Sequence, residues 1–405
     1  MSQQLEVQGD STRIENRQKI SFVTPRFGSD INGGAEFGAR MIAERLVQRG
    51  FRVDALTTVA GDIAKWEPKY DEGVSVENGV KVHRFAVDQG RSKDFAAYSR
   101  KIEFFAKSAT REEALEYIRL QGPVSAGLLE AIPEADADFI AFYPYLYHPV
   151  VHSMPKVARR SVLHPAAHDE APLYLPIFKD IFERTGRMVF HTYAEEDLVK
   201  SVFRISQVRR TVLGLGVDPA PAPSKLSGQE VLGLAAEEPY ICALGRVDTL
   251  KGTTMLADFV SAYRERHRNS VSLALVGPVA VAPEEKSWLK IPGQVSEDEK
   301  WAILRDCSLL VSPSYYESFS LVLMEAWSVG IPVLVNGRCA ATTEHVVRST
   351  GGLIFQNYPE FEIALETILN SQATKNELGQ KGKLYVEKNF TWSVVIDRYV
   401  NFLFG

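Results

Sequence analysis

Residues 308–335 read SLLVSPSYYESFSLVLMEAWSVGIPVLV, with two apolar runs on either side of a longer amphipathic segment. Its first apolar run stops at the Ser-Pro-Ser triplet 312–314, which is typical of a strand buried on both faces. A polar turn with Glu317 follows, and from Phe319 the apolar residues recur at helical spacing. Gly330 ends that helix, and a second apolar run begins three residues later. The stretch therefore predicts a β–α–β unit of a parallel sheet.

Two acidic residues lie eight positions apart in this unit, around the start of the predicted helix. Glu317 precedes the first helical turn, and Glu325 lies two turns in. A helix N-terminus exposes unpaired N–H groups and a partial positive charge, which together suit a phosphate. The turn therefore predicts a phosphate site flanked by carboxylates. The competing interpretation is a solvated helix face.

Length and composition restrict the class of protein. A chain of 405 residues with 45% apolar residues is long enough for two domains of roughly 200 residues each. The net charge of −5 gives no basic footprint, which argues against nucleic acid as a partner. Three cysteines, without the spacing of metal ligands, indicate reduced thiols in a cytoplasmic protein. No apolar run approaches the ~20 residues of a membrane span.

The first half of the chain opens like a nucleotide-binding fold. An apolar run at 19–27 predicts a strand, and an amphipathic pattern at 35–48 predicts a helix. Between them, Gly33 and Gly34 would let the backbone approach a bound group, although a plain tight turn is the alternative. The motif G-x-G-x-x-G is missing, which disfavours a nicotinamide-dependent dehydrogenase.

Two other features of the first half are candidates for chemistry. The sequence EADAD at 134–138 contains an Asp-x-Asp triplet, but it directly precedes a predicted strand at 139–143. We interpret it as a capping turn and predict no metal site. His164 and His168 lie at the end of a strand predicted at 160–167, where functional side chains are common. We favour His168 for the site and His164 as a core residue, and the choice between the two histidines stays open.

The second half repeats the strand–turn–helix pattern with cations in the turn. A strand is predicted at 240–244 and a helix at 253–267, with Arg246 and Lys251 between them. Two cations at a helix N-terminus can clamp a diphosphate. The next strand, at 271–276, ends at Gly277. A short strand or loop at 291–295 then precedes a capping box formed by Ser296 and Glu299.

The second half contains the order Pro-Ser, Glu317, a gap of seven residues, Glu325-Ala and Gly-x-Pro-Val, and it also contains Gly-Arg246-x-x-x-x-Lys251-Gly. Together these motifs resemble the signature of family 4 glycosyltransferases, also named glycosyl transferases group 1. The resemblance implies an α/β protein of the GT-B fold, with two Rossmann-like, doubly wound domains facing each other across a cleft. One departure is the sequence NGRCAATTEHV at 336–346, where many members have a glycine-rich turn.

The domain boundaries expected from this resemblance divide the chain into four parts. Residues 1–18 are a disordered lead-in, and residues 19–218 form an N-terminal acceptor-binding domain. Residues 219–388 form a C-terminal domain that binds a nucleotide sugar. Residues 389–405 form a terminal helix that crosses back to the first domain.

The resemblance also implies roles for particular residues. Those expected at the reaction centre are His168, Arg246, Lys251 and Glu317. Those expected to bind the donor are Gly33, Gly34, Gly277, Val295, Ser320, Leu321 and Glu325. Arg246 and Lys251 would stabilise the departing diphosphate without a metal, and Glu325 would bind the ribose hydroxyls.

The implied function is retaining, metal-independent transfer of a hexose from a nucleotide-diphosphate sugar, with a UDP-sugar as the expected donor and no cofactor. The acceptor would be a glycan, a lipid-linked molecule or a small molecule, in polysaccharide biosynthesis. The expected location is cytoplasmic, with weak peripheral contact to the inner face of the membrane left open, as is the oligomeric state. Alternatives with the same fold are a nucleotide-sugar epimerase, a glucan phosphorylase or synthase, and a non-catalytic nucleotide-sugar sensor.

Overall fold

The computed structural model describes residues 18–31, 33–223, 225–267 and 271–405. The chain divides into two compact units. Unit 1 comprises Met1–Pro165, Tyr174–Met188 and Gln207–Arg209, and unit 2 comprises Ala166–Leu173, Val189–Ser206 and Arg210–Gly405. Unit 2 therefore combines the C-terminal half with two short segments of the first half. The predicted lead-in 1–18 lies, except for Gln18, outside the described residues.

The described residues of the first half form an eight-stranded sheet in the order β3-β4-β2-β1-β5-β6-β7-β8. Its strands are β1 (Lys19–Val23), β2 (Arg52–Thr58), β3 (Gly73–Glu77), β4 (Val80–Phe85), β5 (Phe139–Phe142), β6 (Ser161–Leu163), β7 (Arg187–Phe190) and β8 (Arg209–Val212). Strands β4, β2, β1, β5, β6 and β7 pair in parallel, and β3 pairs antiparallel with β4. This is the doubly wound arrangement predicted for the first half.

Helices connect these strands. They are α1 (Gly34–Gln48), α2 (Phe95–Phe105), α3 (Arg111–Gln121), α4 (Ala126–Glu134), α5 (His148–Ser153), α6 (Phe178–Arg184) and α7 (Tyr193–Val202), with short 3-10 turns at Ala106–Ser108, Met154–Arg160 and Ala171–Tyr174. The Asp-x-Asp triplet follows α4, and Asp138 accepts a hydrogen bond from the Lys19 N–H at 2.8 Å. Among the described residues, no group of three or more potential ligand side chains is arranged to hold a metal ion.

The second half forms a sheet whose order in the described residues is β11-β10-β9-β12-β13-β14, and all its pairings are parallel. Its strands are β9 (Tyr240–Leu244), β10 (Ser272–Val276), β11 (Leu289–Gly293), β12 (Leu310–Ser312), β13 (Val333–Asn336) and β14 (Gly352–Phe355). Its helices are α8 (Gly228–Leu232), α9 (Thr253–His267), α10 (Glu297–Asp306), α11 (Leu321–Ser328), α12 (Ala340–Ser349), α13 (Tyr358–Leu369), α14 (Gln372–Asn389) and α15 (Trp392–Phe404).

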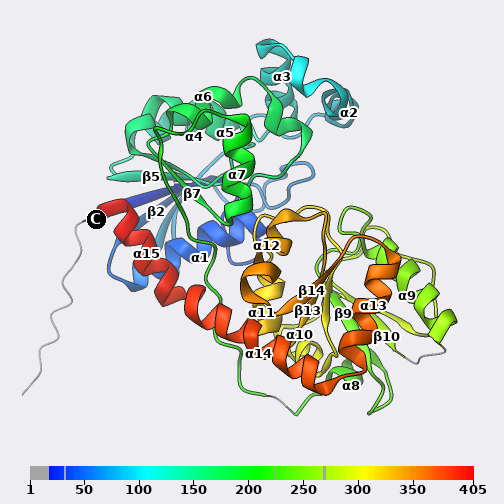
Figure 1. Ribbon diagram of the computed structural model, residues 1–405. Coiled ribbons are helices and arrows are strands. Elements are labelled where there is room, and N and C mark those ends of the chain that lie inside the picture. The colour runs from blue at the N-terminus through cyan, green and yellow to red at the C-terminus, as the bar shows by residue number, and fades with distance from the viewer. Residues whose placement is uncertain (1–17, 32, 224, 268–270) are drawn as a thin grey trace, which may run out of the picture. The chain divides into compact units, whose positions relative to one another are not determined.

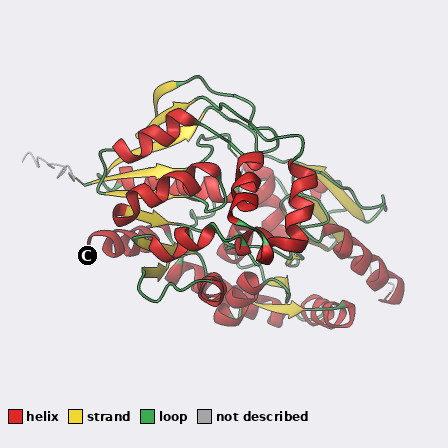
Figure 2. Ribbon diagram, turned by 90° about the horizontal axis from the view of Figure 1, so that it is seen from above, coloured by secondary structure: helices red, strands yellow, loops and turns green. Residues whose placement is uncertain are grey.

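Helices cover both faces of this second sheet. Figure 1 shows α9 and α13 on one side of the strands and α11 and α12 on the other. Figure 2 shows the helices and strands of the described residues in a second view. The apolar core on the first side includes Val260 and Tyr263 of α9, Leu273 of β10, and Phe361 and Leu365 of α13, all fully buried. Strands covered on both faces explain the continuous apolar runs in the sequence.

Each sheet has a point at which the strand order reverses. In the first sheet β1 lies between β2 and β5, and in the second β9 lies between β10 and β12. Loops leave the carboxyl ends of such neighbouring strands in opposite directions, and ligands bind in the crevice between them. The Gly33-Gly34 turn follows β1. The turn with Arg246 and Lys251 follows β9, and the turn with Glu317 follows β12.

Several predicted elements agree closely with the structure. The strand at 240–244, the helix at 253–267 and the capping box of Ser296 and Glu299 are confirmed. The helix predicted from Phe319 begins instead at Leu321, because Ser320 has a left-handed backbone conformation (φ 69°) that ends regular helix geometry. The segment 217–234, which is broken by several prolines and glycines, contains α8, capped by Ser227.

The structure also describes the state of the cysteines and the apolar character of the helices. Cys242, Cys307 and Cys339 are buried and form no disulfide. No helix of the described residues combines the length and the apolar character needed to cross a membrane.

Candidate active site

The turn after β9 is organised by an aspartate that sequence reasoning did not single out. Asp248 accepts the Lys251 N–H at 2.7 Å and is ion-paired with the Arg246 guanidinium, and its own carbonyl accepts the Thr253 hydroxyl at 3.0 Å. Burial alone would raise the pKa of Asp248, but these hydrogen bonds and charges lower it overall. Asp248 therefore fixes both cations at the N-terminus of α9. Asp248 lies only two positions after Arg246 in the sequence, and this spacing could have predicted that the two side chains pair.

An ion pair joins the turn after β9 to the turn after β12. The Lys251 ammonium lies 2.6 Å from Glu317 Oε1, and both side chains are partly buried. With Gly245, Arg246 and Ser314 they line a narrow cavity of about 20 Å³. The structure thus brings together three of the four residues predicted for the reaction centre.

Glycines allow the strand ends beside this cavity to approach each other. Gly245 and Gly277 have φ values of 128° and 141°, which side-chain-bearing residues rarely adopt. A Cβ atom on Gly277 would lie 2.1 Å from the Gly245 carbonyl oxygen. The Gly277 N–H donates to the Gly293 carbonyl at 2.9 Å, so the ends of β9, β10 and β11 stay close. Val295, which is one of the residues expected to bind the donor, follows β11 by two positions and is half-buried.

The N-terminus of α11 has the features of an anion site. Ser320 is only 8% exposed, and its hydroxyl has no hydrogen-bond partner within the described protein. The first turn, which begins at Leu321, contains no acidic residue, and Ser320 makes no side-chain cap. A buried hydroxyl without a partner costs free energy, so the Ser320 hydroxyl is available to donate a hydrogen bond to a ligand.

Glu325 lies one turn further along α11 and is paired. Its Oε1 atom accepts a hydrogen bond from the Lys300 ammonium at 2.9 Å. Burial raises the pKa of Glu325, and the charge of Lys300 acts against this shift. Lys300 comes from α10, so the pair joins two helices and leaves Oε2 for another partner. Lys300 was missed because its partner lies 25 positions away in the sequence.

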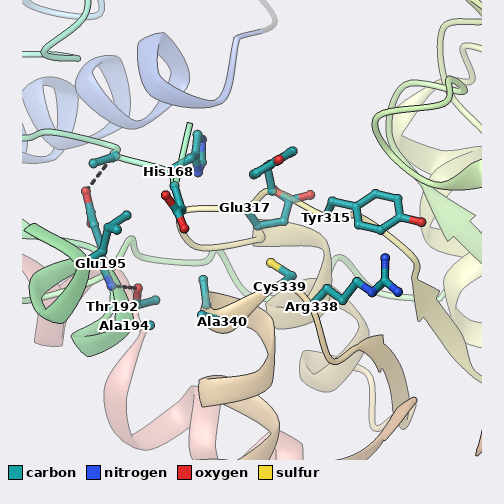
Figure 3. Close-up of a pocket in the computed structure, with 14 residues that line it drawn as sticks. His168, Thr192, Ala194, Glu195, Tyr315, Glu317, Arg338, Cys339 and Ala340 are labelled. Atoms are coloured by element: carbon teal, nitrogen blue, oxygen red, sulfur yellow. Dashed lines mark hydrogen bonds between the residues drawn. The ribbon is translucent and has the colours of Figure 1, made fainter. Parts of the chain in front are cut away.

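A larger cavity of about 580 Å³ lies within unit 2 (Figure 3). It is lined by Ala167, His168, Asp169, Thr192, Ala194, Glu195, Leu198, Tyr315, Tyr316, Glu317, Arg338, Cys339, Ala340 and Ala341. His168 and Glu317 therefore share one cavity. Burial lowers the pKa of His168, although the charge of Glu317 acts in the opposite direction. Burial therefore favours the neutral form of the imidazole.

The two candidate histidines have different surroundings. His168 lines the cavity, whereas His164 is 1% exposed and its ring stacks on Tyr143 with the centroids 4.6 Å apart. His164 is thus a core residue of unit 1, as expected. This placement favours His168 as the histidine of the site.

Glu195 is a further residue of this cavity whose contacts sequence reasoning missed. Its carboxylate accepts the Ala167 N–H at 2.8 Å (Figure 3). It also accepts the His191 N–H at 2.7 Å. Burial raises the pKa of Glu195 to about 8, and the two backbone hydrogen bonds act against this shift. Glu195 thus holds the turn before His168 against the start of α7. The spacing Thr192-x-x-Glu195 resembles a capping box, and that signal was available.

The predicted glycine pair belongs to unit 1. Gly33 is the N-cap of α1, and a Cβ atom there would overlap the Glu36 carboxylate, whereas Gly34 has open space around it. Glu36 is ion-paired at 2.6 Å with the buried Arg26. The Glu36 carboxylate therefore occupies the space beside Gly33 in the first turn of α1. Of the two glycines, only Gly34 leaves space in which a bound group could approach the backbone.

The loop that departs from the glycine-rich pattern is firmly anchored. The Arg338 N–H donates to Asn336 Oδ1 at 3.0 Å, and Asn336 Nδ2 donates to the Pro313 carbonyl at 3.0 Å. The Arg338 guanidinium lies 6.0 Å from the ring centre of Tyr315. An arginine thus occupies the cavity wall where the resemblance led us to expect small residues.

The residues that form the narrow cavity and α11 fall in a region with a family match. Residues 227–385 match the family model described as glycosyl transferases group 1. The matched range contains Arg246, Lys251, Glu317 and Glu325. The family resemblance drawn from the sequence is therefore confirmed.

Matches to other proteins extend the similarity into the first half. The D-inositol 3-phosphate glycosyltransferase of Stackebrandtia nassauensis is 26% identical over 272 residues, which are 62% of this chain and 61% of that protein. An uncharacterized glycosyltransferase of Methanocaldococcus jannaschii is 22% identical over 399 residues, which are 95% of this chain and 97% of that protein. The match thus spans about three fifths of the first relative and nearly all of the second.

Solved structures confirm the fold class. Sucrose-phosphate synthase from Thermosynechococcus elongatus has a TM-score of 0.68 at 19% identity, covering 95% of this chain and 98% of that chain. Anabaena HepE in complex with UDP and glucose has a TM-score of 0.66 at 15% identity, covering 96% and 99%. With two parallel-sheet α/β domains, the protein has the GT-B fold.

Proposed function

We propose that the protein is a retaining glycosyltransferase that moves a hexose from a UDP-sugar to a hydroxyl group of an acceptor. The observation that carries this proposal is the convergence of Arg246, Lys251 and Glu317 where the strand order reverses, at the narrow cavity beside Gly245. Parallel sheets bind ligands at this position. A fixed pair of cations matches a diphosphate.

The donor would be bound by the second half of the chain. Its diphosphate would interact with Arg246, with Lys251 and with the N-terminus of α11, where the Ser320 hydroxyl has no protein partner. Glu325 Oε2 would accept hydrogen bonds from the ribose. Gly277 and Val295, at the ends of β10 and β11, would contact the nucleoside. UDP as the nucleotide is supported by HepE, which was solved with UDP and glucose.

The chemical step would place the charge of the leaving group next to fixed cations. As the sugar–phosphate bond breaks, negative charge develops on the diphosphate, and Arg246 and Lys251 would stabilise it without reorganising. The retained anomeric configuration would follow from front-face attack, in which the leaving phosphate helps to deprotonate the acceptor hydroxyl. His168 would hydrogen-bond the transferred sugar in the cavity that it shares with Glu317. Unit 1 would receive the acceptor.

The test is thermal unfolding of the purified protein with UDP, GDP and ADP and then with the corresponding diphosphate sugars. A ligand that binds only the folded state raises the melting temperature by mass action. We expect UDP and one UDP-sugar to raise it and the other nucleotides to have less effect. Product analysis with that UDP-sugar then reports transfer and anomeric configuration. No response to any of the three nucleotides would contradict the proposed donor site.

Other proteins of this fold make different predictions in the same experiment. A non-catalytic sensor would bind the donor but neither transfer nor hydrolyse it. An epimerase would convert the UDP-sugar without an acceptor. Following the fate of the sugar after binding therefore separates these alternatives from transfer.

A further inference from the structure

Unit 1 contains a cavity of about 530 Å³ that the proposed donor site does not use. It lies between the loop after β2 and the segment after β4, so it is at the carboxyl edge of two parallel strands. Its basic and hydroxyl side chains are Lys65, Arg91, Ser92, Lys93 and Ser99. Loops at this edge of a doubly wound sheet are where ligands bind.

Arg91 is the central side chain of this cavity. Its guanidinium carbon lies 4.7 Å from the ring centre of Phe95 and 5.9 Å from that of Trp66. Its Nε atom is buried and has no hydrogen-bond partner within the described protein, and no described carboxylate forms an ion pair with Arg91. Burial lowers the pKa of Arg91. The charge of Asp62 acts against this shift. A buried N–H group without a partner is costly, and the Nε–H of Arg91 is therefore available to a ligand.

The walls of the cavity are built around Arg91. Asp62 accepts the N–H groups of Lys65 at 2.7 Å and Glu67 at 2.8 Å, which closes the loop. The indole N–H of Trp66 donates to the Gln121 carbonyl at 2.6 Å. The Arg91 N–H donates to the Lys65 carbonyl at 3.2 Å. These contacts hold Arg91 against the Asp62–Glu67 loop before any ligand arrives.

Gly90 makes this approach possible. A Cβ atom on Gly90 would lie 2.4 Å from the Lys65 carbonyl oxygen, so a larger residue would push the Arg91 segment away from the loop. The backbone of Arg91 is thus held by the Lys65 carbonyl, and its guanidinium lies near the aromatic rings of Phe95 and Trp66. A planar, pre-organised guanidinium favours planar or tetrahedral oxyanions that accept two hydrogen bonds.

We propose that this cavity binds an anionic group of the acceptor, a phosphate or a carboxylate, with Arg91 as the main ligand and Lys65 and Lys93 as supporting charges. Glu103 lines the same cavity. It would favour a group that also offers a hydroxyl, as a sugar phosphate does. The proposal rests on the proposed function, in which unit 1 receives the acceptor. The anionic group could belong to a soluble sugar phosphate or to a lipid headgroup.

The experiment measures binding by isothermal titration calorimetry with hexose 6-phosphates and the matching neutral hexoses, each in the presence of UDP. A second arm measures sedimentation with phosphatidylcholine vesicles that contain or lack phosphatidylglycerol. The variant Arg91→Met removes the charge and keeps the apolar stem between the rings. Arg100→Met on α2, whose side chain is exposed and outside the cavity, is the matched control.

We expect the phosphorylated ligand to bind at least tenfold more tightly than its neutral counterpart, since a charge-assisted hydrogen bond contributes about this factor. Arg91→Met should remove that advantage, Arg91→Lys should restore part of it, and Arg100→Met should leave it unchanged. A preference for soluble hexose phosphates or for phosphatidylglycerol vesicles would support the site if Arg91→Met loses it. The arm that shows the preference would identify whether the anionic group belongs to a soluble sugar phosphate or to a lipid headgroup.

Equal binding of charged and neutral ligands in both arms would overturn the proposal, and so would a preference that survives in Arg91→Met. Failure of this proposal is distinguishable from failure of the proposed function. UDP binding by Arg91→Met should equal that of the wild type, because the proposed donor residues lie elsewhere. An unfolded Arg91→Met would be recognised by a lost UDP response, and Arg91→Lys then decides the question.

Discussion

The Glu195 carboxylate accepts the Ala167 N–H at 2.8 Å, one residue before His168. The same carboxylate accepts the His191 N–H at the start of α7. One side chain therefore fixes both segments of the first half that belong to unit 2. Ala166, which precedes this turn, has a positive φ of 51°, so the turn needs such a restraint.

Glu195→Ala should lower both stability and activity. Two buried N–H groups would lose their acceptor, which costs about 2–5 kcal/mol in the free energy of unfolding. His168 would lose its fixed position, so kcat should fall more than the KM for the donor rises. Urea unfolding and steady-state kinetics measure the two effects.

Asp197→Ala, on the same helix and 75% exposed, is the matched control and should change little. Glu195→Gln keeps one acceptor oxygen and should be intermediate. A Glu195→Ala variant with wild-type kcat at a temperature where it is folded would show that the turn does not depend on this carboxylate.

Lys251→Met should slow transfer far more than it weakens donor binding. If Lys251 stabilises charge that develops on the leaving diphosphate, its loss removes an interaction that is strongest in the transition state. We expect kcat to fall by about a hundredfold or more. Single-turnover kinetics with saturating UDP-sugar measure this step. An unchanged turnover number would remove Lys251 from the chemical step.

Glu325→Ala should weaken donor binding more than it slows transfer. It removes the proposed ribose acceptor and leaves the Lys300 ammonium without its partner at 2.9 Å. We expect donor affinity to fall by about tenfold to a hundredfold, as for a hydrogen bond to a charged group, with a smaller effect on kcat. Calorimetric titration with UDP measures the affinity. Equal affinities of the variant and the wild type would contradict the assignment.

Gly277→Ala should destabilise the protein more than Gly330→Ala. Both glycines have positive φ, 141° and 77°, so either alanine costs about 1–2 kcal/mol of backbone strain. Only at Gly277 would the new Cβ also collide with a carbonyl oxygen, that of Gly245 at 2.1 Å. Chemical unfolding of both variants measures the difference. Equal destabilisation would mean that the ends of β9 and β10 can separate at no cost.

His345 predicts a loss of stability in acid. Burial lowers its pKa to about 3, while its Nδ1 atom lies 3.0 Å from the Tyr385 hydroxyl. The unfolded state, with a pKa near 6.5, binds the proton first as pH falls, so acid favours unfolding. This contribution is fully present above about pH 6.5 and is lost toward pH 3, at about 1.4 kcal/mol per pH unit.

The variant His345→Gln isolates this contribution. Its free energy of unfolding should fall less steeply between pH 6.5 and 4.5 than that of the wild type, measured by urea unfolding at several pH values. His191, whose pKa burial lowers to about 4, remains in the variant and keeps part of the slope. Parallel curves for the two proteins would show that His345 does not titrate in this way.

Buried parallel strands and their turns were predictable from the sequence because their apolar runs are continuous. This is how β9 and α9 were located to the residue, and how Arg246, Lys251 and Glu317 were identified. The edge strand β3 was missed because its residues are exposed and show no buried face. The left-handed Ser320 was missed because nothing in its neighbours requires that conformation.

Contacts between distant residues were beyond the reach of sequence patterns. Lys251 and Glu317 are 66 positions apart, and Lys300 and Glu325 are 25 apart. Only the order of the strands brings such pairs together. Arg91 was passed over for a similar reason, since its cavity is formed by two loops that follow different strands.

The discontinuous composition of unit 2 limits how the chain can be divided. A fragment that starts at 219 would include the whole group 1 match and Glu317, yet it would lack His168, Glu195 and half the wall of the cavity. During synthesis, those wall residues leave the ribosome long before Glu317 and Cys339 exist. The cavity can therefore assemble only after the second half has been translated, which ties its formation to the completion of almost the whole polypeptide.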